Sequence, residues 1–69
     1  MSHKEYLKHI GMELRVARVR HGYSQTIVAT KTGLSVAAVC DVEKGNTDSK
    51  ILTLKRIADV LGVEMRDFL

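Results

Sequence analysis

Side chains able to perform acid–base, nucleophilic or metal chemistry are few in this sequence. Asp41 and Glu43 form one close acidic pair, Cys40 is the single cysteine, and three histidines are scattered along the chain. One cysteine cannot form an internal disulfide, and this set lacks the spacing of zinc ligands. No nucleophile–base pair and no phosphate-cradling glycine loop is present. The sequence therefore predicts no enzyme, no metal site and no cofactor.

Glu43 has a different predicted role, because its partner is indicated by helical spacing. Arg18 follows Leu14 by four residues and Ile10 by eight, which places it on or beside the apolar face of a helix. Glu43 ends the apolar stripe of a later helix. An isolated charge facing a core is costly to desolvate, whereas two opposite charges stabilise each other if they meet. We therefore predict a partly buried Arg18–Glu43 ion pair; the alternative is that both side chains extend into solvent.

The overall composition indicates one small domain, residues 1–69, with an anionic partner. The net charge is +3, and 45% of the residues are hydrophobic. Residues 1–35 carry six basic and two acidic side chains, whereas residues 36–69 carry five and six. An ordinary solvated helix face explains such a distribution about as well as a binding surface does. No apolar run approaches the ~20 residues of a membrane helix, and no signal peptide is apparent, so a cytoplasmic protein without membrane contact is expected.

Glycines and small polar residues divide the chain into about five short helices. The first is predicted over residues 4–21 and ends at Gly22. Ser24 and Ser35 are predicted to cap a second helix over residues 25–31 and a third over residues 36–44. The third helix is expected to face inward with the stripe of Val36, Val39, Cys40 and Glu43, where Cys40 acts as a small apolar group.

The remaining residues predict a fourth helix and a final turn. Asp48 or Ser49 is the expected cap, and Gly62 the expected end. The apolar stripe of the fourth helix comprises Leu54, Ile57, Ala58 and Leu61. Residues 63–69 are too few for an independent helix and are expected to form a turn packed on a neighbour. Nothing alternates with period two over a useful length, so an all-α fold is predicted.

Several short stretches occur at the spacing of one family. They are Leu14-Arg15 with Arg18, Gly22-Tyr23-Ser24-Gln25, Val28-Ala29, Thr32-Gly33-Leu34-Ser35, Val39, Val42-Glu43-Lys44-Gly45 and residues 54–63. With them, the sequence from Ile10 to Phe68 resembles the lambdoid phage repressor and Cro-like (XRE) family. The resemblance implies a compact five-helix, lambda-repressor-like domain with a helix-turn-helix in its second and third helices. It also implies a salt bridge between Arg18 and Glu43.

The resemblance further implies that residues 35–44 form a recognition helix in the major groove of double-stranded DNA. The expected base-facing residues are Gln25, Val36, Ala37 and Asp41. Val36 and Ala37 are limited to contacts with thymine methyls, and Asp41 is able to accept from a cytosine amino group, so direct base contacts are sparse. The expected phosphate contacts are Ser24, Thr26, Ser35, Lys44, Asn46, Thr47 and Lys50. The alternative for each of these is a cap or a solvated loop residue.

The expected function is a transcriptional regulator of repressor type that binds a palindromic operator as a homodimer. The expected dimer interface is the apolar C-terminal group of Val63, Met65, Phe68 and Leu69; alternatively, these residues close the core of the monomer. A chain of 69 residues leaves no room for a separate ligand domain, so no small-molecule ligand is expected. The competing hypothesis is a protein-interaction module, such as an antitoxin-like partner, with weak or no specific DNA binding.

Overall fold

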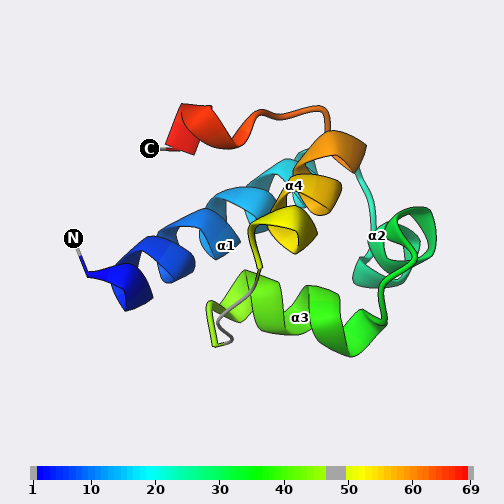
Figure 1. The fold of residues 1–69 in the computed structure, drawn as a ribbon. Coiled ribbons are helices and arrows are strands. Elements are labelled where there is room, and N and C mark those ends of the chain that lie inside the picture. The colour runs from blue at the N-terminus through cyan, green and yellow to red at the C-terminus, as the bar shows by residue number, and fades with distance from the viewer. Residues whose placement is uncertain (1, 47–49, 69) are drawn as a thin grey trace.

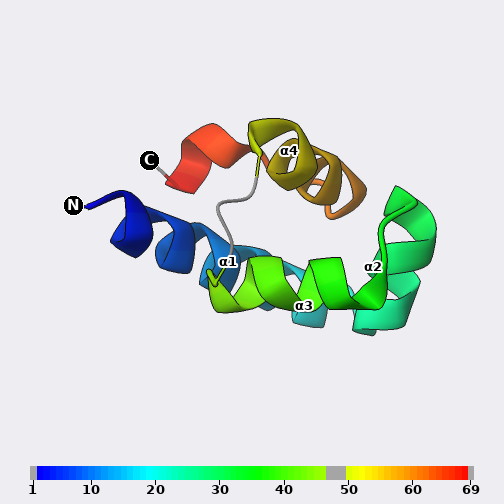
Figure 2. The ribbon, with the colours of Figure 1, turned by 60° about the horizontal axis from the view of Figure 1, so that its bottom comes forward.

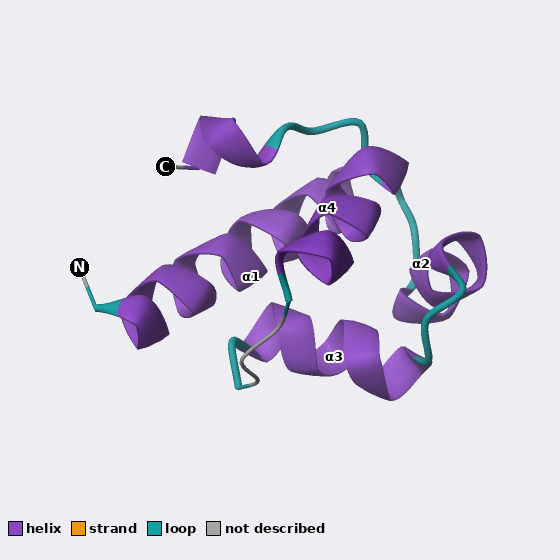
Figure 3. Ribbon diagram, in the orientation of Figure 1, coloured by secondary structure: helices purple, strands orange, loops and turns teal. Residues whose placement is uncertain are grey.

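The computed structural model describes residues 2–46 and 50–68, in which helices are joined by turns and loops (Figures 1 and 3). Its elements are α1 (His3–Arg20), α2 (Gln25–Thr32), α3 (Val36–Lys44), α4 (Ile51–Val60) and a short 3₁₀ helix, η1 (Met65–Phe68). No strand occurs in the described ranges, which confirms the all-α prediction. The predicted number of five helices needs one correction, because the last element is a 3₁₀ turn.

Serine caps begin three of the helices. The side chains of Ser2, Ser24 and Ser35 each accept a hydrogen bond from the amide three residues further along, at the start of α1, α2 and α3. Such caps satisfy amide groups that the first helical turn leaves without partners. Helix α4 differs: its N-cap position is Lys50, whose side chain makes no capping bond. The residues expected to cap this helix, Asp48 and Ser49, lie outside the described ranges.

The helices enclose one aliphatic core. Its largest fully buried side chains are Ile10, Leu14, Val28, Val39 and Leu61. In Figure 2, α4 and η1 lie on one side of the α1–α3 layer, and α2 packs against α3 and α4 at the end of it. All four residues of the predicted stripe around α4, from Leu54 to Leu61, are buried. The 3.6-residue periodicity of the sequence therefore locates the inner face of this helix correctly.

The inner face of α3 differs from the predicted stripe. Val39 and Val42 are buried, whereas Val36 is 42% exposed and Cys40 is half-buried. The apolar face is rotated from the expected one because Val42, rather than Cys40, follows Val39 into the core; the side chain of Glu43 is shielded from water as predicted. The predicted role of Cys40 as an inner apolar group is therefore wrong.

Helix α1 crosses α3 at a glycine. Gly11 is buried, and a Cβ atom at this position would collide with the backbone carbonyl oxygen of Val42 and lie 3.0 Å from that of Glu43. The backbones of the two helices therefore approach more closely than any side chain at residue 11 would permit. This contact determines the point along α1 at which α3 crosses it.

The C-terminal segment returns along α1, so that both ends of the chain lie on the same side of the molecule (Figure 1). Val63, Met65 and Phe68 are partly buried against the core; Leu69 lies outside the described residues. His21 at the end of α1 contacts the carbonyl oxygen of Leu61 through Nε2 at 2.6 Å. None of the described helices is both long and apolar enough to cross a bilayer.

Candidate nucleic-acid interface

Helices α2 and α3 are joined by a tight turn in which Gly33 has a φ of 76°. In this left-handed conformation glycine has no steric penalty, and the amide of Gly33 bonds back to the carbonyl of Ala29. Thr32 is buried beside the turn; its hydroxyl donates to the carbonyl of Val28 and accepts from the amide of Leu34. The turn is therefore held by local bonds, and its geometry is that of a helix-turn-helix.

Arg18 and Glu43 form the ion pair that their spacing predicts. Arg18 Nε donates to Glu43 Oε2 at 2.6 Å and Nη2 donates to Oε1 at 3.1 Å, and the two side chains are only 13% and 7% exposed. The remaining guanidinium nitrogen, Nη1, donates to the carbonyl of Tyr23 at 2.8 Å. The hydrogen bond to Glu43 raises the pKa of Arg18 above its ordinary value, so the guanidinium stays charged at any ordinary pH.

Gln25 also binds Glu43. Its Nε2 donates to Glu43 Oε1 at 3.1 Å. One carboxylate therefore connects α1 through Arg18, α2 through Gln25, and its own helix α3. The sequence analysis expected Gln25 to face bases, and the structure shows that one of its two amide hydrogens is already engaged within the protein.

The outer face of α3 carries the other three predicted base-facing residues. With 3.6 residues per turn, Ala37, Asp41 and Lys44 project from the side opposite the buried pair Val39 and Val42, whereas Val36 lies at the border of this outer face, next to Val39. Val36, Ala37 and Lys44 are exposed, and Asp41 is half-buried. The N-terminal part of this face is apolar, and its C-terminal part is charged.

A basic hollow of about 230 Å³ lies beside this face, lined by Arg15, Arg18, Gln25, Cys40, Glu43 and Lys44. Glu43 neutralises Arg18. In the described part of the chain, the unpaired cations that line this hollow are therefore Arg15 and Lys44, whose side chains are exposed. Arg15 was not among the predicted DNA contacts. Its position one turn before Arg18 (i−3) is the signal that would have identified it.

The predicted phosphate contacts lie where the helix-turn-helix meets solvent. Ser24 and Ser35 are exposed and act as caps through bonds of 3.1 and 3.0 Å to the amides of Ile27 and Ala38. Thr26, Asn46 and Lys50 are exposed, and Thr47 lies outside the described residues. The described positions among them are accessible, and a phosphate contact by any of the predicted residues remains a prediction.

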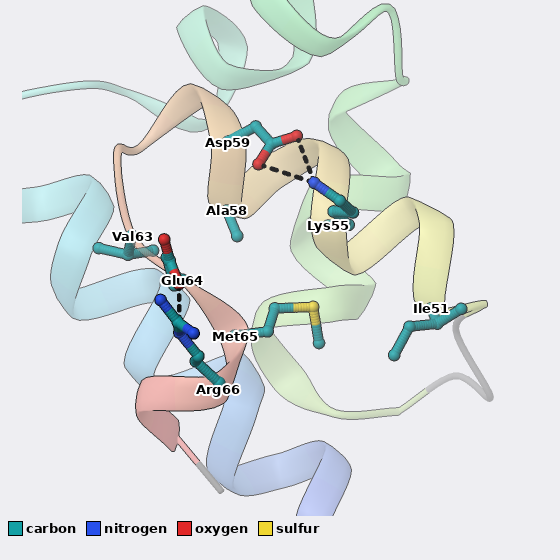
Figure 4. A pocket seen from close by; sticks show the side chains of 8 residues that line it. All are labelled: Ile51, Lys55, Ala58, Asp59, Val63, Glu64, Met65 and Arg66. Carbon is teal, nitrogen blue, oxygen red and sulfur yellow. Dashed lines mark hydrogen bonds and ion pairs between the residues drawn. The ribbon is translucent and has the colours of Figure 1, made fainter.

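A second hollow, of about 440 Å³, lies between α4 and the C-terminal segment (Figure 4). Ile51 and Met65 flank it, and Ile51 is 65% exposed. The ion pairs Lys55–Asp59 and Glu64–Arg66 are exposed at its border. The hollow is thus an apolar depression with charges of both signs at its edge.

Comparisons with known proteins agree with this geometry. The model of a helix-turn-helix family matches residues 14–68. The crystal structure of the restriction-modification controller protein C.AhdI from Aeromonas hydrophila superimposes with a TM-score of 0.87 and 29% sequence identity, over 100% of both chains. No curated protein sequence matches the chain.

Proposed function

Because the chain belongs to the XRE-type helix-turn-helix family of DNA-binding transcriptional regulators, we propose that it binds a palindromic operator as a homodimer. In this proposal α3 of each copy lies in the major groove of one half-site. The observation that carries it is the exposed outer face of α3, which Glu43 holds in a fixed position relative to α1 and α2. We propose no catalytic activity for this face.

Charge supports a contact with DNA at this face. Arg15 and Lys44 are exposed beside the outer face of α3, and Lys50 follows the loop after it. Cations in such positions bind phosphates and release counterions, which supplies affinity without base specificity. The exposed starts of α2 and α3 add amide groups and the positive ends of two helix dipoles.

Val63, Met65 and Phe68, with Leu69, are the proposed dimer contact. A single copy has one recognition helix, and a palindromic site needs two, about 34 Å apart. The hollow beside Met65 and the exposed side chain of Ile51 provide apolar surface that a second copy would cover. Likeness to a restriction-modification controller protein makes the genes of such a system the first candidates for regulation.

Selection of bound sequences from random DNA duplexes tests the proposal. A dimeric regulator is expected to recover sites with two inverted half-sites centred about one helical turn apart. Sequencing of the bound fraction and analytical ultracentrifugation of the complex give the symmetry and the stoichiometry. Recovery of unrelated sequences, or of one chain per duplex, would contradict it.

A protein-interaction module is the second candidate, and the outer face of α3 favours it in one respect. Val36 and Ala37 carry no hydrogen-bonding side chain, and Asp41 is negatively charged. Salt dependence separates the two functions. For DNA binding, log K falls linearly with log salt, at a slope of about −0.9 per phosphate contacted. A protein partner bound through an apolar face would show a nearly flat response.

A further inference from the structure

We propose that Val36 and Ala37 recognise the 5-methyl group of thymine, so that each half-site carries thymine at one or more fixed positions. This inference rests on the proposed DNA-binding function and specifies which base chemistry the recognition helix selects. It concerns the first turn of α3, where the two residues are adjacent and exposed.

Among the exposed large hydrophobic residues of the described ranges, Val36 is the one that lies on α3. Its side chain is 42% exposed, whereas Val39 and Val42 of the same helix are at 0% and 4%. An exposed isopropyl group next to an exposed methyl group, at the start of α3, forms a small apolar surface. That surface gains free energy when it covers another apolar group and excludes water.

Two polar side chains near this turn are each partly engaged within the protein. Ser35, directly before the turn, accepts from the amide of Ala38 at 3.0 Å. Gln25 donates to Glu43 at 3.1 Å. Val36 and Ala37 themselves make side-chain contacts through carbon atoms alone. In the major groove, the group that such a surface distinguishes is the thymine methyl.

Charged side chains on the same face further restrict the bases and the binding partner that this face accepts. Asp41 lies one turn beyond Ala37 and has no donor, so it disfavours the O6 and N7 acceptors of guanine at its own position. Lys44, a further turn on, is exposed and adjacent to the basic hollow with Arg15, where a phosphate neutralises both. DNA is therefore the occupant that fits an apolar turn followed by a cationic end.

The test compares four bases at each conserved thymine of a duplex recovered by selection. One half-site carries thymine, uracil, cytosine or 5-methylcytosine, and affinity is measured at constant salt. Uracil lacks only the methyl group, and 5-methylcytosine restores it on a different base pair. We expect uracil to weaken binding about fourfold relative to thymine, and 5-methylcytosine to bind about fourfold tighter than cytosine, as burial of one methyl-sized group predicts.

A substitution at Val36 tests whether the preference for thymine over uracil depends on this side chain. Val36→Ala keeps a good helix former at an exposed position and is expected to reduce the thymine-to-uracil ratio to below about twofold. The matched control is Val19→Ala, a valine that is 60% exposed on α1 and should leave the ratio unchanged. Circular dichroism verifies that both variants remain helical.

The outcomes distinguish this inference from the proposed function. Salt-dependent, specific binding with equal affinities for thymine and uracil overturns the inference alone, as does a recovered site without a fixed thymine or an unchanged ratio in Val36→Ala. Failure to bind any duplex overturns the proposed function, and this inference with it.

Discussion

Arg18 and Glu43 meet through two parallel hydrogen bonds, one of 2.6 Å and one of 3.1 Å, although 25 residues separate them in the chain. Both side chains are largely shielded from water, so the pair was desolvated when the protein folded. Removal of one partner leaves the other charge buried without compensation.

Arg18→Ala is therefore expected to lower the free energy of unfolding by about 3 kcal/mol, the lower end of the range for broken buried pairs. Urea denaturation measures it. Lys55→Ala is the matched control, because the Lys55–Asp59 pair is more than 60% exposed and should be worth less than about 1 kcal/mol. A similar, small loss in both variants would mean that the Arg18–Glu43 pair contributes no more than a surface one.

Gly11→Ala is expected to destabilise the protein by about 2 kcal/mol or more, since the added methyl collides with the backbone of α3. Alanine normally stabilises a helix interior relative to glycine, so the sign of the effect is diagnostic. The change is measured by thermal and urea unfolding. Met12→Ala, at an exposed neighbour, should change stability by less than about 0.5 kcal/mol.

Ser35→Ala removes the cap of α3 and is expected to cost about 1 kcal/mol of stability. Ser35→Asp retains a capping oxygen and should preserve stability. Its negative charge at the start of the recognition helix should nevertheless weaken DNA binding. Unfolding and DNA titrations on the same two variants separate these roles, and equal DNA affinity of Ser35→Asp and wild type would show that no phosphate lies nearby.

Arg15→Gln and Lys44→Gln are each expected to reduce the slope of log K against log salt by about one, with little change in the recovered sequence. Both cations border the same hollow beside α3. Lys4→Gln, at the exposed start of α1, is the control and should leave the slope unchanged. A cation whose loss leaves the slope intact makes no phosphate contact.

Ile51→Glu is expected to shift the protein from dimer to monomer, because it places a charge beside the hollow that the second copy would cover. Sedimentation equilibrium gives the association constant. Met12→Glu, which changes another apolar residue that is more than half exposed, on α1, should leave that constant unaffected. The dimer proposal fails if wild type sediments as a monomer both alone and on its operator.

Much of the frame was predictable from the sequence for identifiable reasons. Apolar spacing located the buried faces of α1 and α4, and serines before helices with glycines after them located the ends of α2 and α3. The Arg18–Glu43 pair was predictable because each charge alone was unfavourable in its position. Local rules suffice for features whose energy is determined within one or two helical turns.

Features that depend on how two helices cross were not predictable in this way. Gly11 matters only because α3 passes directly over it, and nothing in its own neighbourhood of the chain indicates that. The phase of α3 was misjudged because a nine-residue helix offers few apolar positions, and Val36 and Cys40 fitted a stripe as well as Val42 did. Lys50, the N-cap residue of α4, makes no side-chain capping bond, so the serine or aspartate signal used for the other helices does not stand at this position.

Glu43 connects three helices through a single carboxylate, and this has a consequence for the kinetics of binding. The helices that meet DNA are held in one arrangement before DNA arrives, so little conformational entropy remains to be lost on association. The association rate should then depend on diffusion and electrostatic steering, with a strong response to ionic strength and no slow rearrangement phase. In Glu43→Gln, which keeps the shape but loses the charge, a slower second phase is expected to appear as the helices reorient on the duplex.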